Sequence, residues 1–163
     1  MKPLGAKWRQ KHLDPKLQKY IDKPAPTGFG VLYAYVKTTG HVKAYIGKAS
    51  ARDDGARYRM RGHIRGPLKP NQKSVIHDAI VKHGKDNFCF FILALVPKSD
   101  LNQAEKDAIK KYDTFAATSK GYNVLDGGDG GKLPEEAEAR RKCGGVGCEF
   151  HTCATVHVSS LSI

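Results

Sequence analysis

The sequence lacks a long apolar run. Its longest one, Phe88–Val96, is about half of the roughly 20 residues that a membrane-spanning helix needs. The first residues, Met1-Lys-Pro-Leu-Gly, contain no apolar segment of the kind found in secretory signals. We therefore expect neither a membrane protein nor a secreted one, and predict an intracellular, cytoplasmic location.

The chain is also poor in acidic residues. It has 16 Asp and Glu against 28 Lys and Arg, which gives a formal net charge of +12. An excess of this size favours a polyanionic partner. Nucleic acid is the first candidate, and an anionic membrane surface is the second.

Cysteine is scarce, and no secretory signal accompanies it, so a disulfide framework is not expected. Cys89 lies inside the apolar run and is interpreted as a buried thiol. Three further cysteines crowd the end of the chain beside a histidine. As a set they have the soft-ligand composition of a zinc site, although their spacing matches no standard finger: Cys143, Cys148, His151 and Cys153. A Zn²⁺ site and an incidental tail both remain open.

Composition divides the chain into three segments. Residues 1–27 form a basic N-terminal arm, in which Asp14-Pro15 predicts the start of a short helix. Residues 28–131 carry the regular apolar patterns and end in a glycine-rich break. Residues 132–163 form a tail.

The middle segment predicts an α/β fold. Two tyrosine- and valine-rich strands, Val31–Lys37 and Val42–Ile46, flank a short turn and indicate a β-hairpin. Phe88–Val96 is apolar on both faces, which favours a central strand covered on both sides. Helices are expected over about 56–65, 73–83 and 100–112. The predicted architecture is a small, mostly antiparallel three-stranded sheet flanked by helices.

Glu105 is the most informative single residue. At about 100° per residue it falls inside the apolar stripe of the last expected helix, whose other members are Leu101, Ala104, Ala108, Ile109 and Tyr112. A carboxylate on such a stripe is unfavourable unless it is paired or bound to a metal. Two interpretations follow: a structural ion pair, or a carboxylate that holds a hard cation near phosphate.

A second feature is the basic stretch from Lys48 to Lys73. Its candidates for DNA binding are Arg52, Arg57, Arg61, Arg65, Lys69 and Lys73. Arg59 and His63 are four residues apart and therefore share a helical face. An arginine suits the oxygens of a scissile phosphate, and a histidine can move a proton. By charge alone, the stretch could equally be a solvated face that only contacts backbone phosphates.

Taken together, these residues are ordered as in a known superfamily. The matching segments are, in chain order, Val31-Leu-Tyr33, Tyr45-Ile-Gly47 followed by Lys48, Arg59-Met-Arg-Gly-His63, Lys82-His-Gly84 with Phe88, Glu105 and Gly121-Tyr-Asn123. Over about residues 28–128 the sequence resembles the GIY-YIG nucleases, particularly the phage-type free-standing and homing endonucleases. It departs from the pattern at Val31, where the family has glycine. The loop after Tyr45 is long, which leaves Arg57 as a competitor of Arg59.

The resemblance implies hydrolysis of DNA phosphodiester bonds with one divalent cation, Mg²⁺ or Mn²⁺. It assigns the metal to Glu105 and a nonbridging phosphate oxygen to Arg59. Tyr33 would accept a proton from water, and Tyr45 would orient that water. A phenol is a weak base at pH 7, so Tyr33 needs nearby positive charge from Lys48 or His63. Asn123 would support the site.

The resemblance leaves several alternatives open. The expected partner is double-stranded DNA, in a phage or a bacterial host, and the enzyme is expected to be site-specific, of the homing or restriction type. A structure-specific repair nuclease and a non-catalytic nucleic-acid-binding module are the alternatives. A nuclease with one site must either form a homodimer on DNA or act twice to break both strands.

Overall fold

The structure is a computed structural model that describes residues 4–50, 53–66, 74–125 and 127. Of residues 4–6 it describes only the backbone. All of the described residues belong to one compact unit, Met1–Lys132. The helices are α1 (Leu4–His12), α2 (Arg57–Arg65), α3 (Val75–His83) and α4 (Leu101–Tyr112), and two 3₁₀ segments are η1 (Pro15–Ile21) and η2 (Lys85–Asn87). The strands are β1 (Phe29–Lys37), β2 (Ala44–Ser50) and β3 (Phe88–Pro97).

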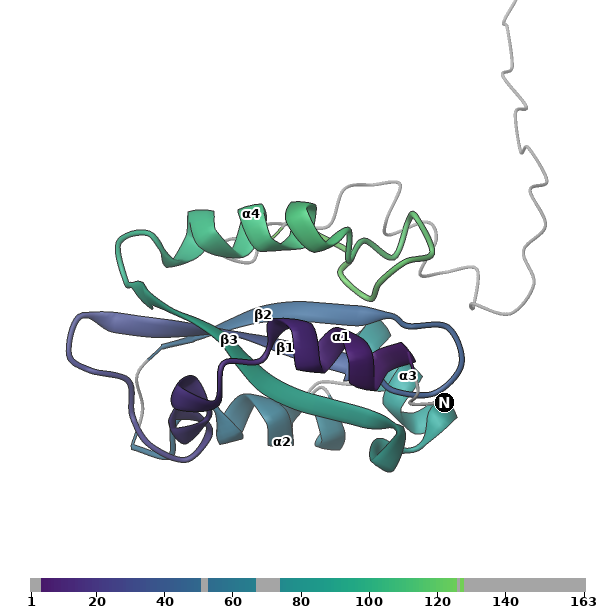
Figure 1. Cartoon of the computed structure of the whole chain (residues 1–163), viewed down its shortest axis with the longest axis horizontal. Coiled ribbons are helices and arrows are strands. Elements are labelled where there is room, and N and C mark those ends of the chain that lie inside the picture. Colours follow the sequence, from purple (N-terminus) through teal and green to yellow (C-terminus); the bar gives the residue numbers. More distant parts are fainter. Residues whose placement is uncertain (1–3, 51–52, 67–73, 126, 128–163) are drawn as a thin grey trace, which may run out of the picture. The chain divides into compact units, whose positions relative to one another are not determined.

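The three strands form one antiparallel sheet in the order β2-β1-β3. Helix α4 covers one face, and α2 and α3 cover the other (Figure 1). The predicted class, a three-stranded antiparallel sheet flanked by helices, is confirmed for the described part of the chain. In that part, no helix is long and apolar enough to cross a membrane.

The place of β3 in the sheet differs from the sequence prediction. We expected Phe88–Val96 to be the central strand, but β1 is central and β3 lies at an edge. Phe91 packs with the α4-side core, and Ile92 packs with the opposite core beside η1. Layers on both faces explain why the strand is apolar on both sides.

Side-chain amides bond the backbone at both outer edges of the sheet. Gln18 of η1 accepts from the amide of Ile92 (3.0 Å) and donates to its carbonyl (2.9 Å) on β3. Asn123 accepts from the amide of Ile46 (2.9 Å) and donates to its carbonyl (2.7 Å) on β2. Two further bonds reach the β2 edge: the amide of Tyr122 donates to the carbonyl of Ala44, and Arg59 donates to that of Lys48.

The N-terminal arm is part of this fold. Asp14 caps η1 by accepting from the amide of Lys16 (2.9 Å), so the predicted start at Asp14-Pro15 is confirmed, although the segment is a 3₁₀ helix. Helix α1 was not expected. Its Trp8 ring packs edge-on against Phe91 and Tyr112, with centroids 5.9 and 5.5 Å away, which attaches α1 to the α4 side of the core.

Candidate active site at the edge of β2

The sheet brings two tyrosines together on its α2 face. Tyr33 of β1 and Tyr45 of β2 point to this face, with ring centroids 6.3 Å apart and a hydrogen bond between their side chains. The register of β1 against β3 shifts between Leu32 and Tyr33, an irregularity of the kind that redirects side chains near functional sites. Tyr33 is fully buried, whereas Tyr45 is half-buried.

Helix α2 adds a histidine to this pair. The hydroxyl of Tyr33 and Nε2 of His63 are hydrogen-bonded at 2.9 Å, and the His63 ring lies 4.9 Å from that of Tyr45. Burial, and then the charges of Arg59 and His77, lower the pKa of His63 to about 4. His63 is therefore neutral at pH 7. A hollow of about 300 Å³ opens beside it, lined in part by Arg59, Ser74 and His77.

Both phenols stay protonated at neutral pH in this arrangement. Burial raises the pKa of Tyr33 well above its ordinary value. Burial also raises the pKa of Tyr45, the negative charge of Glu105 raises it further, and Arg59 and the bond with Tyr33 lower it in part. We expected Lys48 or His63 to supply positive charge for Tyr33. Instead His63 is neutral and Lys48 is turned to Glu105, so the cation that acts on both phenols is Arg59.

Glu105 lies on α4, on the other side of the sheet. It is buried (7% exposed) among the apolar residues of its helix, as the stripe predicted. Its Oε2 atom lies 3.7 Å from Nζ of Lys48, a residue of β2 that points to the α4 face. Asn102, one helical turn before Glu105, also bonds the Lys48 ammonium through Oδ1. The predicted ion-pair interpretation of Glu105 thus has a partner in Lys48.

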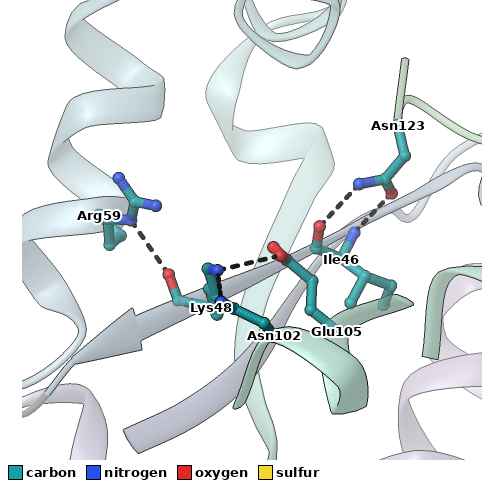
Figure 2. A network of polar contacts seen from close by, with 6 residues as sticks. All are labelled: Ile46, Lys48, Arg59, Asn102, Glu105 and Asn123. Carbon is teal, nitrogen blue, oxygen red and sulfur yellow. Dashed lines mark hydrogen bonds and ion pairs between the residues drawn. The ribbon is translucent and has the colours of Figure 1, made fainter. Parts of the chain in front are cut away.

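The two halves of the site meet around the outer edge of β2, because β2 is an edge strand. Figure 2 shows Arg59 on one side of Lys48 and Glu105 on the other. Nε of Arg59 donates to the backbone carbonyl of Lys48 (3.2 Å), while the Lys48 side chain reaches Glu105. The charge of Glu105 acts on Tyr33, Tyr45 and Arg59 alike. We expected Tyr33, Tyr45, Arg59 and Glu105 to converge on one surface cleft. Instead the tyrosines lie on the α2 face and Glu105 on the α4 face, and the charge of Glu105 reaches the tyrosines and Arg59 across this edge.

Asn123 supports the same edge through the backbone. It holds the amide and carbonyl of Ile46, the residue between Tyr45 and Gly47, and its Oδ1 also accepts from the buried Thr114 hydroxyl (2.7 Å). The amide does not touch the tyrosines. Its contribution is to fix the strand that carries Tyr45.

The other candidates fall in different places. Arg57 pairs with Asp22 and Arg61 pairs with Asp54 (2.5 Å), so these two guanidinium groups already face a carboxylate. Arg65 is exposed at the end of α2. The remaining candidates lie outside the described residues: Arg52, Lys69, Lys73, Cys143, Cys148, His151 and Cys153.

The donor set near Glu105 fits a hard cation. Carboxylate and amide oxygens are ligands that Mg²⁺ accepts, and those of Glu105 and Asn102 already converge on one positive charge, the Lys48 ammonium. The described residues contain no cluster of three or more His, Cys, Asp or Glu that could hold a metal alone. A cation here would therefore complete its shell with water or with phosphate oxygens. Sequence reasoning missed Asn102, which the one-turn spacing to Glu105 could have indicated.

Comparison of the chain with protein-family models, with curated proteins and with solved structures finds no match.

The low pKa of His63 predicts an acid-sensitive fold. In the unfolded chain His63 titrates near 6.5, so between about pH 6.5 and pH 4 the unfolded state binds the proton and the folded state does not. Lowering the pH through this window should reduce the free energy of unfolding by about 3 kcal/mol. The measurement is urea unfolding at several pH values, for the wild type and His63→Gln.

The other histidines titrate in both proteins, so they cancel in this comparison. The Gln variant should have a flatter dependence of unfolding free energy on pH. Equal slopes in the two proteins would mean that folding does not lower the pKa of His63 and that its environment is not the one described here.

Proposed function

We propose that the protein is a divalent-metal-dependent endonuclease that hydrolyses DNA phosphodiester bonds in the manner of the GIY-YIG nucleases. One observation carries the proposal. Tyr33 and Glu105 are 72 positions apart in the chain, yet the site residues lie on the two sides of the outer edge of β2. The charge of Glu105 acts there on Tyr45 and Arg59. A structural ion pair between Lys48 and Glu105 alone would not need tyrosines, a neutral histidine and an arginine beside it.

In this proposal each residue has a distinct part. Glu105, with Asn102, would hold a Mg²⁺ or Mn²⁺ ion, which when bound neutralises charge on the phosphate and on the leaving oxygen. Arg59, exposed at the same edge, binds a nonbridging oxygen as charge builds on it. Lys48 turns its ammonium from Glu105 towards the incoming phosphate.

The tyrosines handle the attacking water. Tyr33 is fully buried, so a water molecule reaches Tyr45 first. Tyr45 orients the water and takes its proton while its own hydroxyl proton passes to Tyr33 through their hydrogen bond, and the Tyr33 proton passes to Nε2 of the neutral His63. The roles of Tyr33 and Tyr45 are thus exchanged relative to our sequence hypothesis, because only Tyr45 has exposed surface.

The direct test is nicking of supercoiled plasmid DNA by the purified full chain, with Mg²⁺, Mn²⁺ or EDTA. Metal-dependent nicking with 5′-phosphate ends is expected, and discrete fragments from a phage-sized genome would support the site-specific, homing or restriction type. Cleavage of branched DNA in preference to plasmid would favour the repair alternative. Binding of DNA without any cleavage would contradict the enzyme and leave the non-catalytic module.

Arg57 and Arg59 provide a matched pair of variants. Arg59→Ala should lower the rate of nicking on the order of a hundredfold or more, because it removes a phosphate contact and the cation that lowers the pKa of both phenols. Arg57→Ala should change the rate less than about threefold, since that guanidinium is paired with Asp22. Rates are compared in single-turnover time courses. The opposite order would identify Arg57 as the catalytic arginine.

A further inference from the structure

The β1–β2 hairpin lies beside the end of α3 (Figure 1). Lysines of the hairpin and of α3 bring a set of positive charges to this place. The amide of Lys37 donates to the carbonyl of Lys43 across the hairpin (2.9 Å). The amide and hydroxyl of Thr38 both donate to the carbonyl of Asn87 (2.8 and 3.0 Å), and the Asn87 side chain donates to the carbonyl of His83 (2.6 Å). We call Lys37, Lys43, Lys82 and His83 the hairpin patch.

The charge of the hairpin patch is uncompensated. Within the described part of the chain, no carboxylate lies within ion-pair distance of its three lysines, including Asp78 one turn before Lys82 and Asp86 in η2. Lys82 and His83 are exposed. Desolvation, and then the charges of Lys37, Lys82 and Lys43, lower the pKa of His83, so all three lysines act on that ring electrostatically.

This patch contrasts with the basic face that the sequence favoured. Arg57 and Arg61 of α2 are paired with Asp22 and Asp54, which reduces the charge they present to a polyanion. The C-terminal end of α3 carries a partial negative charge of about half a unit, which three lysines outweigh. The last carbonyls of α3 are also occupied, by the amide of Gly84 and the side chain of Asn87.

The hairpin patch adjoins the candidate active site. Lys43 precedes Tyr45 by two residues, a separation of about 7 Å along an extended chain. Tyr35 bridges the two regions: its ring packs against His63 of the site at 5.7 Å and against Phe88 at 6.1 Å, and Phe88 lies opposite Lys37 in the sheet. A DNA strand whose phosphate lies at Tyr45 would therefore place a phosphate that is about one or two nucleotides away against the hairpin patch.

We propose that the hairpin patch binds the phosphate backbone of double-stranded DNA immediately beside the bond that is cut. This inference rests on the proposed function for the identity of the polyanion. The lysines contact phosphate oxygens, and His83 contributes a further contact when a phosphate beside it favours its protonated form. The patch, rather than the outer face of α2, supplies most of the salt-sensitive affinity.

The test measures binding of the full chain to a fluorescent 30-base-pair duplex in EDTA, at salt concentrations from about 50 to 200 mM. The variant combines Lys37→Gln, Lys43→Gln and Lys82→Gln. Each lost phosphate contact should reduce the log–log salt slope by about 0.9, so the magnitude of the slope should fall by about 2 to 3. Affinity near 100 mM salt should fall on the order of a hundredfold.

The matched control removes the same number of charges elsewhere: Lys16→Gln, Lys98→Gln and Lys106→Gln, all exposed residues. A control that loses as much slope as the patch variant would overturn the proposal, because net charge alone would then explain both. A second readout is the His83 ring in NMR titrations, whose pKa should rise when the duplex binds. An unchanged His83 pKa would also overturn it.

The outcomes separate this inference from the proposed function. Cleavage by the wild type, with no difference between patch and control variants, would reject the patch and keep the nuclease. Binding that depends on the patch, without metal-dependent cleavage, would reject the nuclease and keep the patch. No binding of the duplex by the wild type would reject both.

Discussion

Glu105→Gln should abolish DNA cleavage while leaving DNA binding nearly intact. Gln keeps the shape of the side chain but loses the negative charge that a hard dication requires. Without the ion, the transition state should lose about 4 kcal/mol of stabilisation or more, which corresponds to a rate loss on the order of a thousandfold. Binding should persist, because phosphate contacts come from lysines and arginines elsewhere.

The test uses one preparation for a gel shift, a Mg²⁺-dependent cleavage time course and a thermal unfolding curve. Asp107→Asn is the matched control, since Asp107 is on the same helix but is exposed and bonded to Gln103 (2.9 Å). It should cleave at the wild-type rate. If Glu105→Gln cleaves DNA at the wild-type rate, Glu105 does not hold the metal ion. A variant that unfolds easily but cleaves normally when folded would show that the Lys48–Glu105 pair is only structural.

Gly47→Ala should destabilise the fold by about 3 kcal/mol, a loss of about 10 °C in Tm. A Cβ atom at this position would lie 2.4 Å from Cζ and from the hydroxyl of Tyr33. Tyr33 is fully buried, so its ring has no open space to enter. It would have to move away from β2, and its hydrogen bond with His63 would break.

Gly62→Ala is the control, because a Cβ atom there meets nothing within 4 Å and Gly62 lies inside α2. That change should raise stability by about 0.5–1 kcal/mol. Thermal and urea unfolding measure both variants. A Gly47→Ala protein within about 0.5 kcal/mol of the wild type would mean that Tyr33 does not pack over Gly47.

Local signals in the sequence predicted several elements well. Asp14-Pro15 predicted the start of η1, because the cap depends on backbone chemistry within a few residues. The apolar stripe of α4 placed Glu105 in a buried position for the same reason. The resemblance to GIY-YIG nucleases and the activity that it implies stay predictions.

Other features depend on contacts between distant segments. Strand β2 runs over Ala44–Ser50 and not over the predicted Val42–Ile46, since its second half packs small residues under the Tyr33 ring and pairs with β1. Among the described side chains of helix α1, Trp8 packs against residues of β3 and α4 that lie far along the chain. No local pattern contains these partners.

The amides of Gln18 and Asn123 have a consequence for assembly. Exposed edge strands are templates on which a second chain can add a strand, and proteins block such edges to avoid aggregation. At β2 the carbonyls of Ala44 and Lys48 and both backbone groups of Ile46 already have partners, and at β3 both backbone groups of Ile92 do. Two copies that cooperate to cut both strands of a duplex would therefore meet through helices, loops or the DNA itself, and not by joining their sheets into one.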